Sequence, residues 1–265
     1  MKFFIIAFTL LFSTCAGARD FFILAVPTVA PWAYTQDDSD QLTGIDIDLL
    51  RTISRESGYK FEFKPMSYSR SIQELKKENI DGIAGVSTEY AKIHGFKYIR
   101  HPYLENVVQN VYQRADDENI IHKYSQLYTR IVGMIKSFSS AEKLNEDPLI
   151  NKEFSEDPNF LFDKLINKEL DIVVGSDWEA SHYLQSRRKP LHYFVPVTFK
   201  SGKTIMTDRT IIFSPKVEDG AIRKIDRTVD VLINDKILDN ILDSYWEKIH
   251  NPVDETSSDN PQDQH

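Results

Sequence analysis

The chain lacks the residues for internal disulfides and, after its first residues, any long apolar run. Its single cysteine, Cys15, lies in an apolar stretch at the N-terminus, so no disulfide can staple the remaining fold. No later run approaches the roughly 20 apolar residues that a spanning helix needs. The 265 residues are 41% hydrophobic, which is enough for one large or two medium domains with ordinary cores.

Positive charge is also scarce. The 32 lysines and arginines are outnumbered by 40 acidic residues, and the net charge of −8 argues against general nucleic-acid binding. The histidines are scattered, and the sequence has no H-E-x-x-H, no glycine-rich phosphate loop and no G-x-S-x-G turn. We therefore expect no metal, no cofactor and no nucleic-acid partner.

The two ends of the chain predict processing and disorder. Lys2 followed by the apolar residues 3–12 and the small residues 16–18 predicts a cleaved export leader over 1–18, and hence a protein that works outside the cytoplasm. An alternative would make Cys15 the acylated residue of a lipoprotein, although residues 12–14 match that pattern poorly. Residues 251–265 are polar and acidic and predict a disordered tail.

The segment 44–88 alternates between helical and strand patterns. Ile47, Leu50 and Ile53 fall on one face of a helix predicted over 46–57, and Gly58 is its stop. Residues 59–63 alternate aromatic and charged side chains, as a half-buried strand does.

A second helix, capped by Ser69 or Ser71 and with Ile72 and Leu75 on its inner face, then leads to a strand over 80–86. This alternation predicts a parallel sheet flanked by helices.

The ordered motifs in this segment resemble those of the family 3 extracellular solute-binding proteins, which include glutamine- and histidine-binding periplasmic proteins. The matching residues are 42–49 (LTGIDIDL), Pro65 with Tyr68, and Leu75 with 81–85 (DGIAG). The resemblance extends over about 21–250. It implies an α/β, two-lobed periplasmic binding protein of type II, in which each lobe is a mainly parallel sheet flanked by helices and hinge strands join the lobes.

On this resemblance, lobe 1 would comprise 19–108 with 209–250, and lobe 2 would comprise 109–208. Residues 107–112 would form a hinge strand and 211–214 the return. Lobe 2 repeats the βα design, because Leu165 and Asp171 are spaced as Leu75 and Asp81 are. The expected elements beyond the first segment are strands at 22–26, 130–135 and 171–175, and helices at 160–167, 220–233 and 236–249.

The resemblance also implies aromatic walls for a ligand. Trp32, in the loop after the first strand, offers a flat face for stacking or for a cation; the alternative is that it and Tyr34 only pack the loop. Tyr68 matches the second wall. Arg70, at the start of the next helix, could hold a carboxylate or phosphate, or be an ordinary surface arginine.

Two anchors of the family's amino-acid site are altered here. Gly85, Ser87 and Thr88 lie in the segment that binds a carboxylate in the relatives, but the arginine of their T-x-E-R motif is missing. Lys92 or Tyr90 takes its place, depending on the gap.

In lobe 2 the relatives hold the ligand's amino group with an aspartate. Counting without a gap, this chain has Ser176 at that position, and Asp177 follows one place later. Ser139, within 136–140, could help to bind an anion at a helix start or could be a simple cap.

These observations favour a non-catalytic, monomeric receptor for a small polar ligand, which it presents to an ABC permease or to a membrane sensor. The ligand would be amino-acid-like or another small charged metabolite. An alternative from the enzyme class is a periplasmic dehydratase of the cyclohexadienyl-dehydratase type, with Asp177, Glu179 or Lys92 as acid or base. A third is a ligand sensor that serves signalling alone.

We predict that the exported protein begins at or near Arg19, because cleavage would follow residue 18. Intact-mass analysis of the periplasmic fraction measures this. Retention of Met1, or an acyl chain on Cys15, would overturn it.

Overall fold

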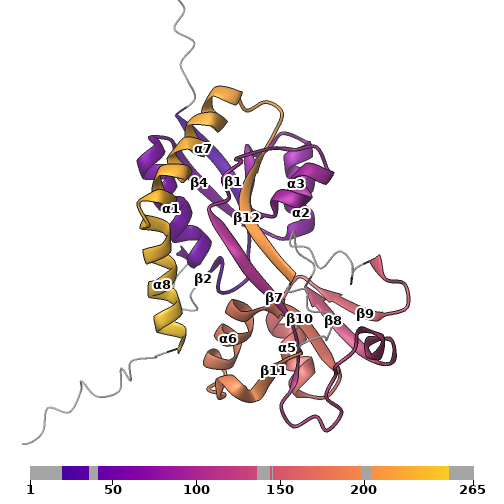
Figure 1. The fold of residues 1–265 in the computed structure, drawn as a ribbon. Coiled ribbons are helices and arrows are strands. Elements are labelled where there is room, and N and C mark those ends of the chain that lie inside the picture. Colours follow the sequence, from indigo (N-terminus) through magenta and orange to yellow (C-terminus); the bar gives the residue numbers. More distant parts are fainter. Residues whose placement is uncertain (1–19, 36–40, 136–143, 145, 198–204, 251–265) are drawn as a thin grey trace, which may run out of the picture.

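Two lobes share one continuous ten-stranded sheet (Figure 1). The strand order is β4-β1-β5-β12-β7-β10-β8-β9, with β6 paired to β12 and β11 paired to β7. Two long strands, β7 (Leu104–Arg114) and β12 (Ile205–Phe213), run through both lobes. The computed structural model of the chain describes residues 20–35, 41–135, 144, 146–197 and 205–250.

Lobe 1 is built around β1, which pairs in parallel with β4 and β5. On one face Leu50 and Val229 belong to a core formed with α1, α7 and α8, and on the other Leu75 and Ile83 pack with α2 and α3. The elements of lobe 1 are β1 (Phe21–Pro27), β2 (Tyr34–Thr35), β3 (Leu42–Thr43), α1 (Ile45–Ser57), β4 (Lys60–Met66), α2 (Tyr68–Lys76), β5 (Gly82–Val86), α3 (Thr88–Ile93), β6 (Lys97–Tyr98), α7 (Asp219–Asn234) and α8 (Ile237–His250).

Lobe 2 repeats this plan, with β8 parallel to β10 and β9, and with β10 antiparallel to β7. Val132 and Met134 lie in the core on one face of its sheet, and Leu161 and Phe162 in the core on the other. Its elements are η1 (Tyr124–Thr129), β8 (Ile131–Ile135), β9 (Asn151–Ser155), α5 (Pro158–Ile166), β10 (Ile172–Ser176), α6 (Asp177–Ser186), η2 (Leu191–Tyr193) and β11 (Phe194–Pro196).

The connection between the lobes is a pair of antiparallel strands. The first half of β12 pairs with β7, and its second half pairs with β5 in lobe 1. The register of the β7–β12 pair shifts between Thr207 and Arg209. The lobe boundaries expected at 108/109 and 208/209 fall inside these two strands and stay a prediction.

The expected two-lobed α/β fold is confirmed, and the local patterns explain most of it. Gly58 ends α1 in the left-handed conformation, with φ 73°. The expected cap of the second helix was wrong: Ser67 caps α2, accepting a hydrogen bond from the Arg70 N–H. Ser71 is instead buried inside that helix and bonds to the Ser67 carbonyl. Residues 1–18, 136–140 and 251–265 lie outside the described residues.

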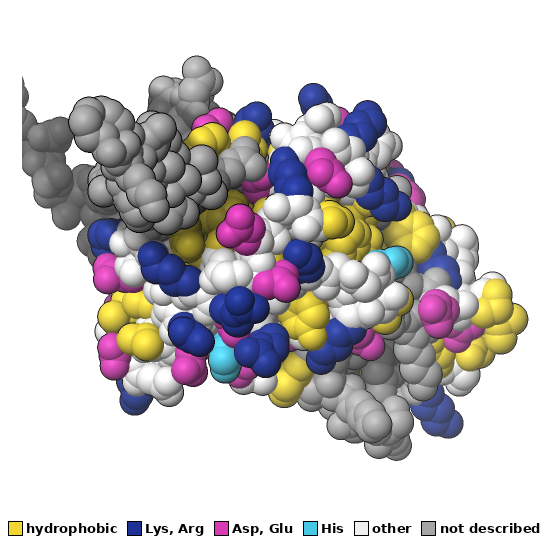
Figure 2. Space-filling view, turned by 90° about the horizontal axis from the view of Figure 1, so that it is seen from above, with side chains coloured by type: hydrophobic (Ala, Val, Ile, Leu, Met, Phe, Trp, Pro, Cys, Tyr) yellow, Lys and Arg dark blue, Asp and Glu magenta, His cyan; other side chains and the backbone are white. Residues whose placement is uncertain are grey.

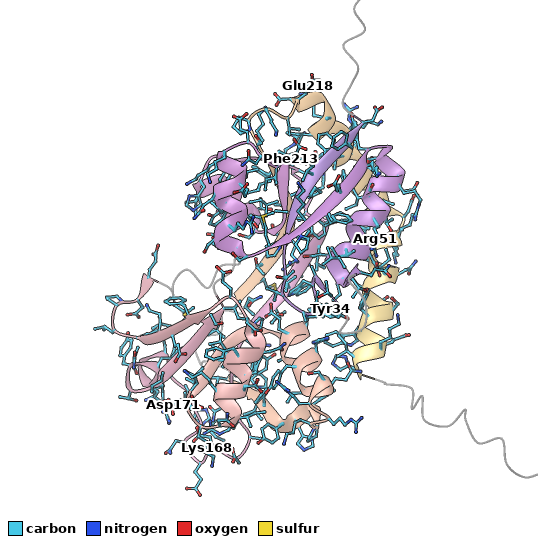
Figure 3. All side chains as sticks on the ribbon, turned by 180° about the vertical axis from the view of Figure 1, so that it is seen from behind. Tyr34, Arg51, Lys168, Asp171, Phe213 and Glu218 are labelled. Carbon is cyan, nitrogen blue, oxygen red and sulfur yellow. The ribbon has the colours of Figure 1, made fainter. Side chains whose placement is uncertain are left out.

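The surface and the spread of the lobes are seen in two further views. Figure 2, seen from above Figure 1, shows basic and acidic side chains interspersed over the described part of that face. In Figure 3, Glu218 and Lys168 mark opposite ends of the molecule, while Tyr34 lies where the lobes meet.

None of the helices in the described part of the chain is long and apolar enough to cross a membrane.

β5 and β12 approach each other closely at Gly82. A Cβ added there would lie 2.6 Å from the backbone oxygen of Ile212. Gly82→Ala should therefore lower the free energy of unfolding by about 1–3 kcal/mol, as overpacking in a core does. Denaturant titration measures this.

The matched control is Gly220→Ala in the first turn of α7, where an added Cβ meets nothing within 4 Å. It should stabilise by about 0.5–1 kcal/mol by restricting the unfolded chain. Equal effects of the two substitutions would refute this account of Gly82.

Candidate ligand site between the lobes

The loop that carries Trp32 is fixed against the start of α1. The backbone N–H of Asp46 donates to the Trp32 carbonyl at 2.9 Å. Gly44, with φ 122°, allows this approach, because a Cβ there would lie 2.4 Å from the same carbonyl oxygen. The Trp32 side chain is only 1% exposed, and its indole N–H donates to Glu179 Oε1 of lobe 2 at 2.9 Å. Trp32 thus joins the two lobes.

An ion pair lies against the Trp32 ring. Arg209 of β12 binds both carboxylate oxygens of Asp46, with Nε to Oδ1 at 2.9 Å and Nη2 to Oδ2 at 2.5 Å. Its guanidinium carbon is 4.2 Å from the centre of the Trp32 ring. The Tyr103 hydroxyl donates to Asp46 Oδ1 at 3.1 Å. Burial alone would lower the pKa of Arg209, but Asp46 raises it above its ordinary value, so the guanidinium stays charged.

Glu179 is held in place by the start of α6. Ser176 and Glu179 form a capping box, in which the Ser176 side chain accepts from the Glu179 N–H and Glu179 Oε2 accepts from the Ser176 N–H. This fixes the carboxylate, because one oxygen is used within lobe 2. The other oxygen is the acceptor for Trp32 across the lobes.

The neighbouring carboxylate, Asp177, is held by the hinge strand β7. It accepts hydrogen bonds from the amide of Asn110 at 2.5 Å and from the hydroxyl of Tyr112. Burial first, and then these contacts with Asp177, raise the pKa of Tyr112 above its ordinary value of 10.0. Tyr112 therefore stays protonated and donates to Asp177.

Aromatic side chains pack together along one edge of the contact between the lobes. Trp178 of lobe 2 lies between two tryptophans of lobe 1, with ring centres 6.1 Å from Trp32 and 4.8 Å from Trp246. The sequence contains three tryptophans, so all of them meet here. Tyr34 and His182 pair across the same edge, with ring centres 5.6 Å apart.

The lobes also touch where α2 meets the segment that follows β9. The Ser69 hydroxyl of α2 donates to Glu156 of lobe 2 at 2.8 Å. In Figure 1, α2 and α8 lie on opposite sides of lobe 1, so contacts between the lobes occur on both sides. The two lobes therefore contact each other on both of these sides.

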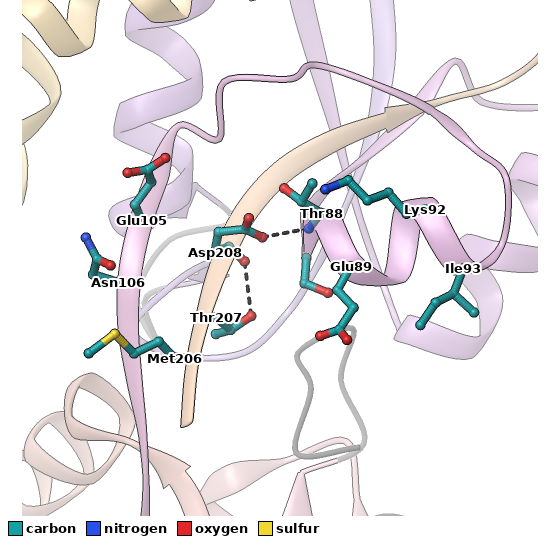
Figure 4. A pocket seen from close by; sticks show the side chains of 10 residues that line it. Thr88, Glu89, Lys92, Ile93, Glu105, Asn106, Met206, Thr207 and Asp208 are labelled. Atoms are coloured by element: carbon teal, nitrogen blue, oxygen red, sulfur yellow. Dashed lines mark hydrogen bonds between the residues drawn. The ribbon is translucent and has the colours of Figure 1, made fainter. Parts of the chain in front are cut away.

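A cavity of about 650 Å³ lies beside the hinge strands (Figure 4). Three carboxylates and one ammonium group line it, together with hydroxyl, amide and apolar side chains. The Asp208 carboxylate accepts from the Thr88 N–H at 2.6 Å, while the Thr88 hydroxyl is buried without a hydrogen-bond partner among the described residues. The lining residues are Ser87, Thr88, Glu89, Lys92, Ile93, Glu105, Asn106, Met206, Thr207 and Asp208.

Three of the residues expected from the sequence come together in this cavity, namely Ser87, Thr88 and Lys92. Of the two candidates for the missing arginine, Lys92 lines the cavity. Tyr90 packs against other aromatic rings, with Tyr68 at 6.3 Å and Phe96 at 6.4 Å.

The other expected residues lie elsewhere. Trp32 and Tyr34 are at the contact between the lobes, whereas Asp177 is bound to Asn110 and Tyr112 of β7. An added Cβ at Gly85 would lie 2.5 Å from Arg209 Nη2. Arg70 is exposed on α2. Ser139 lies outside the described residues.

Sequence reasoning missed Arg209, Asp46 and Asp208 as site residues. Glu179 entered only as a candidate acid or base, although its S-x-x-E spacing from Ser176 predicts a capping box. Arg209 carries no local motif, so only the pairing of β12 with β7 and β5 places it beside residues far away in the chain. Within the described residues, no group of three His, Cys, Asp or Glu side chains is arranged to hold a metal ion.

Comparison with known proteins agrees with this architecture. The family model for bacterial extracellular solute-binding proteins, family 3, matches residues 23–248. One similar structure is the substrate-binding protein of an amino acid ABC transporter, with TM-score 0.70 and 17% identity, covering 86% of this chain and 99% of that one.

Two other structures give the same TM-score and the same two coverages. They are an ancestral arginine-binding protein bound to arginine, with 21% identity, and the arginine-, lysine-, histidine-binding protein ArtJ from Geobacillus stearothermophilus, with 17% identity. At these identities the likeness establishes the fold.

His182 should make the stability depend on pH. Burial lowers its pKa below the ordinary value of 6.5, so the folded protein resists its protonation more than the unfolded chain does. Stability is therefore retained above pH 6.5 and falls as the pH drops through that value. The free energy of unfolding, measured by denaturant titration from pH 8 to 5, should fall less steeply in His182→Gln than in wild type. Parallel pH curves would contradict this.

Proposed function

Because the chain belongs to the bacterial extracellular solute-binding proteins, family 3, we propose that it is a non-catalytic receptor that closes on a small polar ligand. The ligand is amino-acid-like or another small charged metabolite. The protein acts as a monomer in the periplasm and presents the closed, loaded form to an ABC permease or a membrane sensor. Two lobes joined by hinge strands suit this role, because a ligand that contacts both sides shifts the balance towards closure.

The cavity beside the hinge strands is the observation that carries this proposal. Its volume of about 650 Å³ suits a small metabolite, since ligand pockets measure about 300–1,000 Å³. Its wall combines the Lys92 ammonium with the carboxylates of Glu89, Glu105 and Asp208. A ligand with both an anionic and a cationic group complements such a wall.

Each charged group of that ligand has a partner of opposite charge in the lining of the cavity. Lys92, with the nearby Ser87 and Thr88, receives the anionic group, and the unpartnered Thr88 hydroxyl supports this because buried polar groups in folded proteins are normally hydrogen-bonded. Asp208 and Glu105 receive the cationic group. Lysine keeps the charge of the missing family arginine but not its two-pronged geometry, which favours ligands that need only a point charge.

Transport and signalling differ in the membrane partner and not in the binding step. Genes for a permease and an ATPase next to this gene would favour uptake. A neighbouring kinase or cyclase gene would favour sensing.

A thermal-shift screen of the mature protein tests the receptor role. Amino acids, polyamines, carboxylates and sugars form the panel, and a true ligand at 100 times its dissociation constant adds about 2.7 kcal/mol of stability. For the ligand found, Lys92→Ala should weaken binding at least tenfold by calorimetry, because a charge-assisted contact is lost.

Lys76→Ala on α2 is the matched control, since Lys76 is exposed and does not line the cavity. It should bind as wild type does. A panel without any stabilising ligand would count against the receptor role. Equal affinity of the two variants would move the ligand out of this cavity.

A further inference from the structure

The ring of Trp32 and the carboxylate of Asp46 together make a guanidinium site. A guanidinium offers a flat face for an aromatic ring and paired donors for a carboxylate, and these are the two partners found here. Both are buried, with Trp32 at 1% and Asp46 at 2% exposure. A third partner, the Glu179 carboxylate, adds negative charge from lobe 2.

The occupant of this site is the chain's own Arg209. Two contacts of 2.9 and 2.5 Å join its guanidinium to Asp46, and its carbon lies 4.2 Å from the centre of the Trp32 ring. The guanidinium also lies against the backbone of Gly85, where an added Cβ would be 2.5 Å from Nη2. The space between Trp32, Gly85 and Asp46 is therefore filled.

Arg209 and Asp208 are neighbours on β12 but contribute to two different sites. Arg209 contacts Trp32 and Asp46, whereas the next residue back, Asp208, contacts Thr88 and lines the cavity. Arg209 is absent from the lining of that cavity. A ligand in the cavity and a guanidinium beside Trp32 are therefore separate binding events.

We propose that Arg209 is a tethered ligand that determines specificity: it occupies the guanidinium site of the cleft and excludes free guanidinium compounds from it. Because Arg209 is attached to the strand that passes the site, a free compound competes against a high effective concentration. The site is thus specific for the guanidinium group but closed to compounds from solution. This inference concerns the Trp32 side of the cleft and holds whichever ligand fills the cavity.

Removing the Arg209 side chain should open the site to a free guanidinium. Calorimetry with methylguanidinium at millimolar concentrations should show binding to Arg209→Ala that is at least tenfold tighter than binding to wild type. Arg209→Ala combined with Asp46→Asn should lose this gain, because the paired carboxylate oxygens are gone.

Arg187→Ala is the matched control. Arg187 also lies over an aromatic ring, 5.5 Å from the centre of Tyr183, and pairs with Asp163 at 2.8 Å, but its side chain is 50% exposed. Loss of this surface arginine should create no methylguanidinium site. Binding to Arg187→Ala as tight as to Arg209→Ala would show non-specific association and overturn the proposal.

Folding supplies a second measurement, because Arg209→Ala leaves a buried carboxylate unpaired. If this variant does not fold alone, methylguanidinium present during refolding should recover it, and Arg209→Ala with Asp46→Asn should fold without such help. The proposal is wrong if methylguanidinium neither binds nor rescues Arg209→Ala, or if wild type binds it equally well. Either result leaves the thermal-shift screen for the cavity ligand unaffected.

Discussion

The buried ion pair between Asp46 and Arg209 is the interaction on which the Trp32 contact between the two lobes depends. It joins the start of α1 to the second hinge strand, 163 residues away in the sequence. Removing one partner of such a pair costs about 3–5 kcal/mol, because the other charge is left buried and unpaired. The pair also places a guanidinium against Trp32, whose indole N–H reaches Glu179 of lobe 2. The ion pair inside lobe 1 thus packs against the ring of Trp32, the residue that contacts lobe 2.

On the lobe 2 side, the contact uses a feature of ordinary helix formation. Glu179 belongs to the capping box of α6, so its carboxylate is held by a contact within lobe 2. Fixing a long side chain normally costs up to about 2 kcal/mol of rotamer entropy. Here the capping box at the start of α6 already fixes the Glu179 side chain, and its other oxygen, Oε1, accepts from the Trp32 indole. Asp177, two residues earlier, is likewise held by Asn110 and Tyr112 of β7.

The sequence predicts the elements well and the site only in part. The helical spacing of Ile47, Leu50 and Ile53 and the glycine stop at Gly58 place α1 correctly, because these patterns are local. Thr88 and Lys92 reach the cavity because they lie on α3, the helix that follows β5 at the end of a parallel strand. Arg209 could not be found in this way, since its partners are set by sheet order and by the register shift in β12. The cap of α2 was misplaced because three serines, Ser67, Ser69 and Ser71, lie close together in the sequence, and any of them is a competent cap.

The altered anchors of the family site now have a physical interpretation. The chain lacks the arginine of the T-x-E-R motif, yet a buried arginine does lie beside Gly85, brought in from β12. Its charge is already matched by Asp46, so it cannot serve an anionic ligand as an unpaired arginine would. The remaining cation in the lining of the cavity is Lys92, which is an exposed residue of α3. With three carboxylates around that single cation, the described wall of the cavity carries excess negative charge. A ligand that carries only negative charge would therefore meet repulsion there, and electrostatic complementarity selects against it.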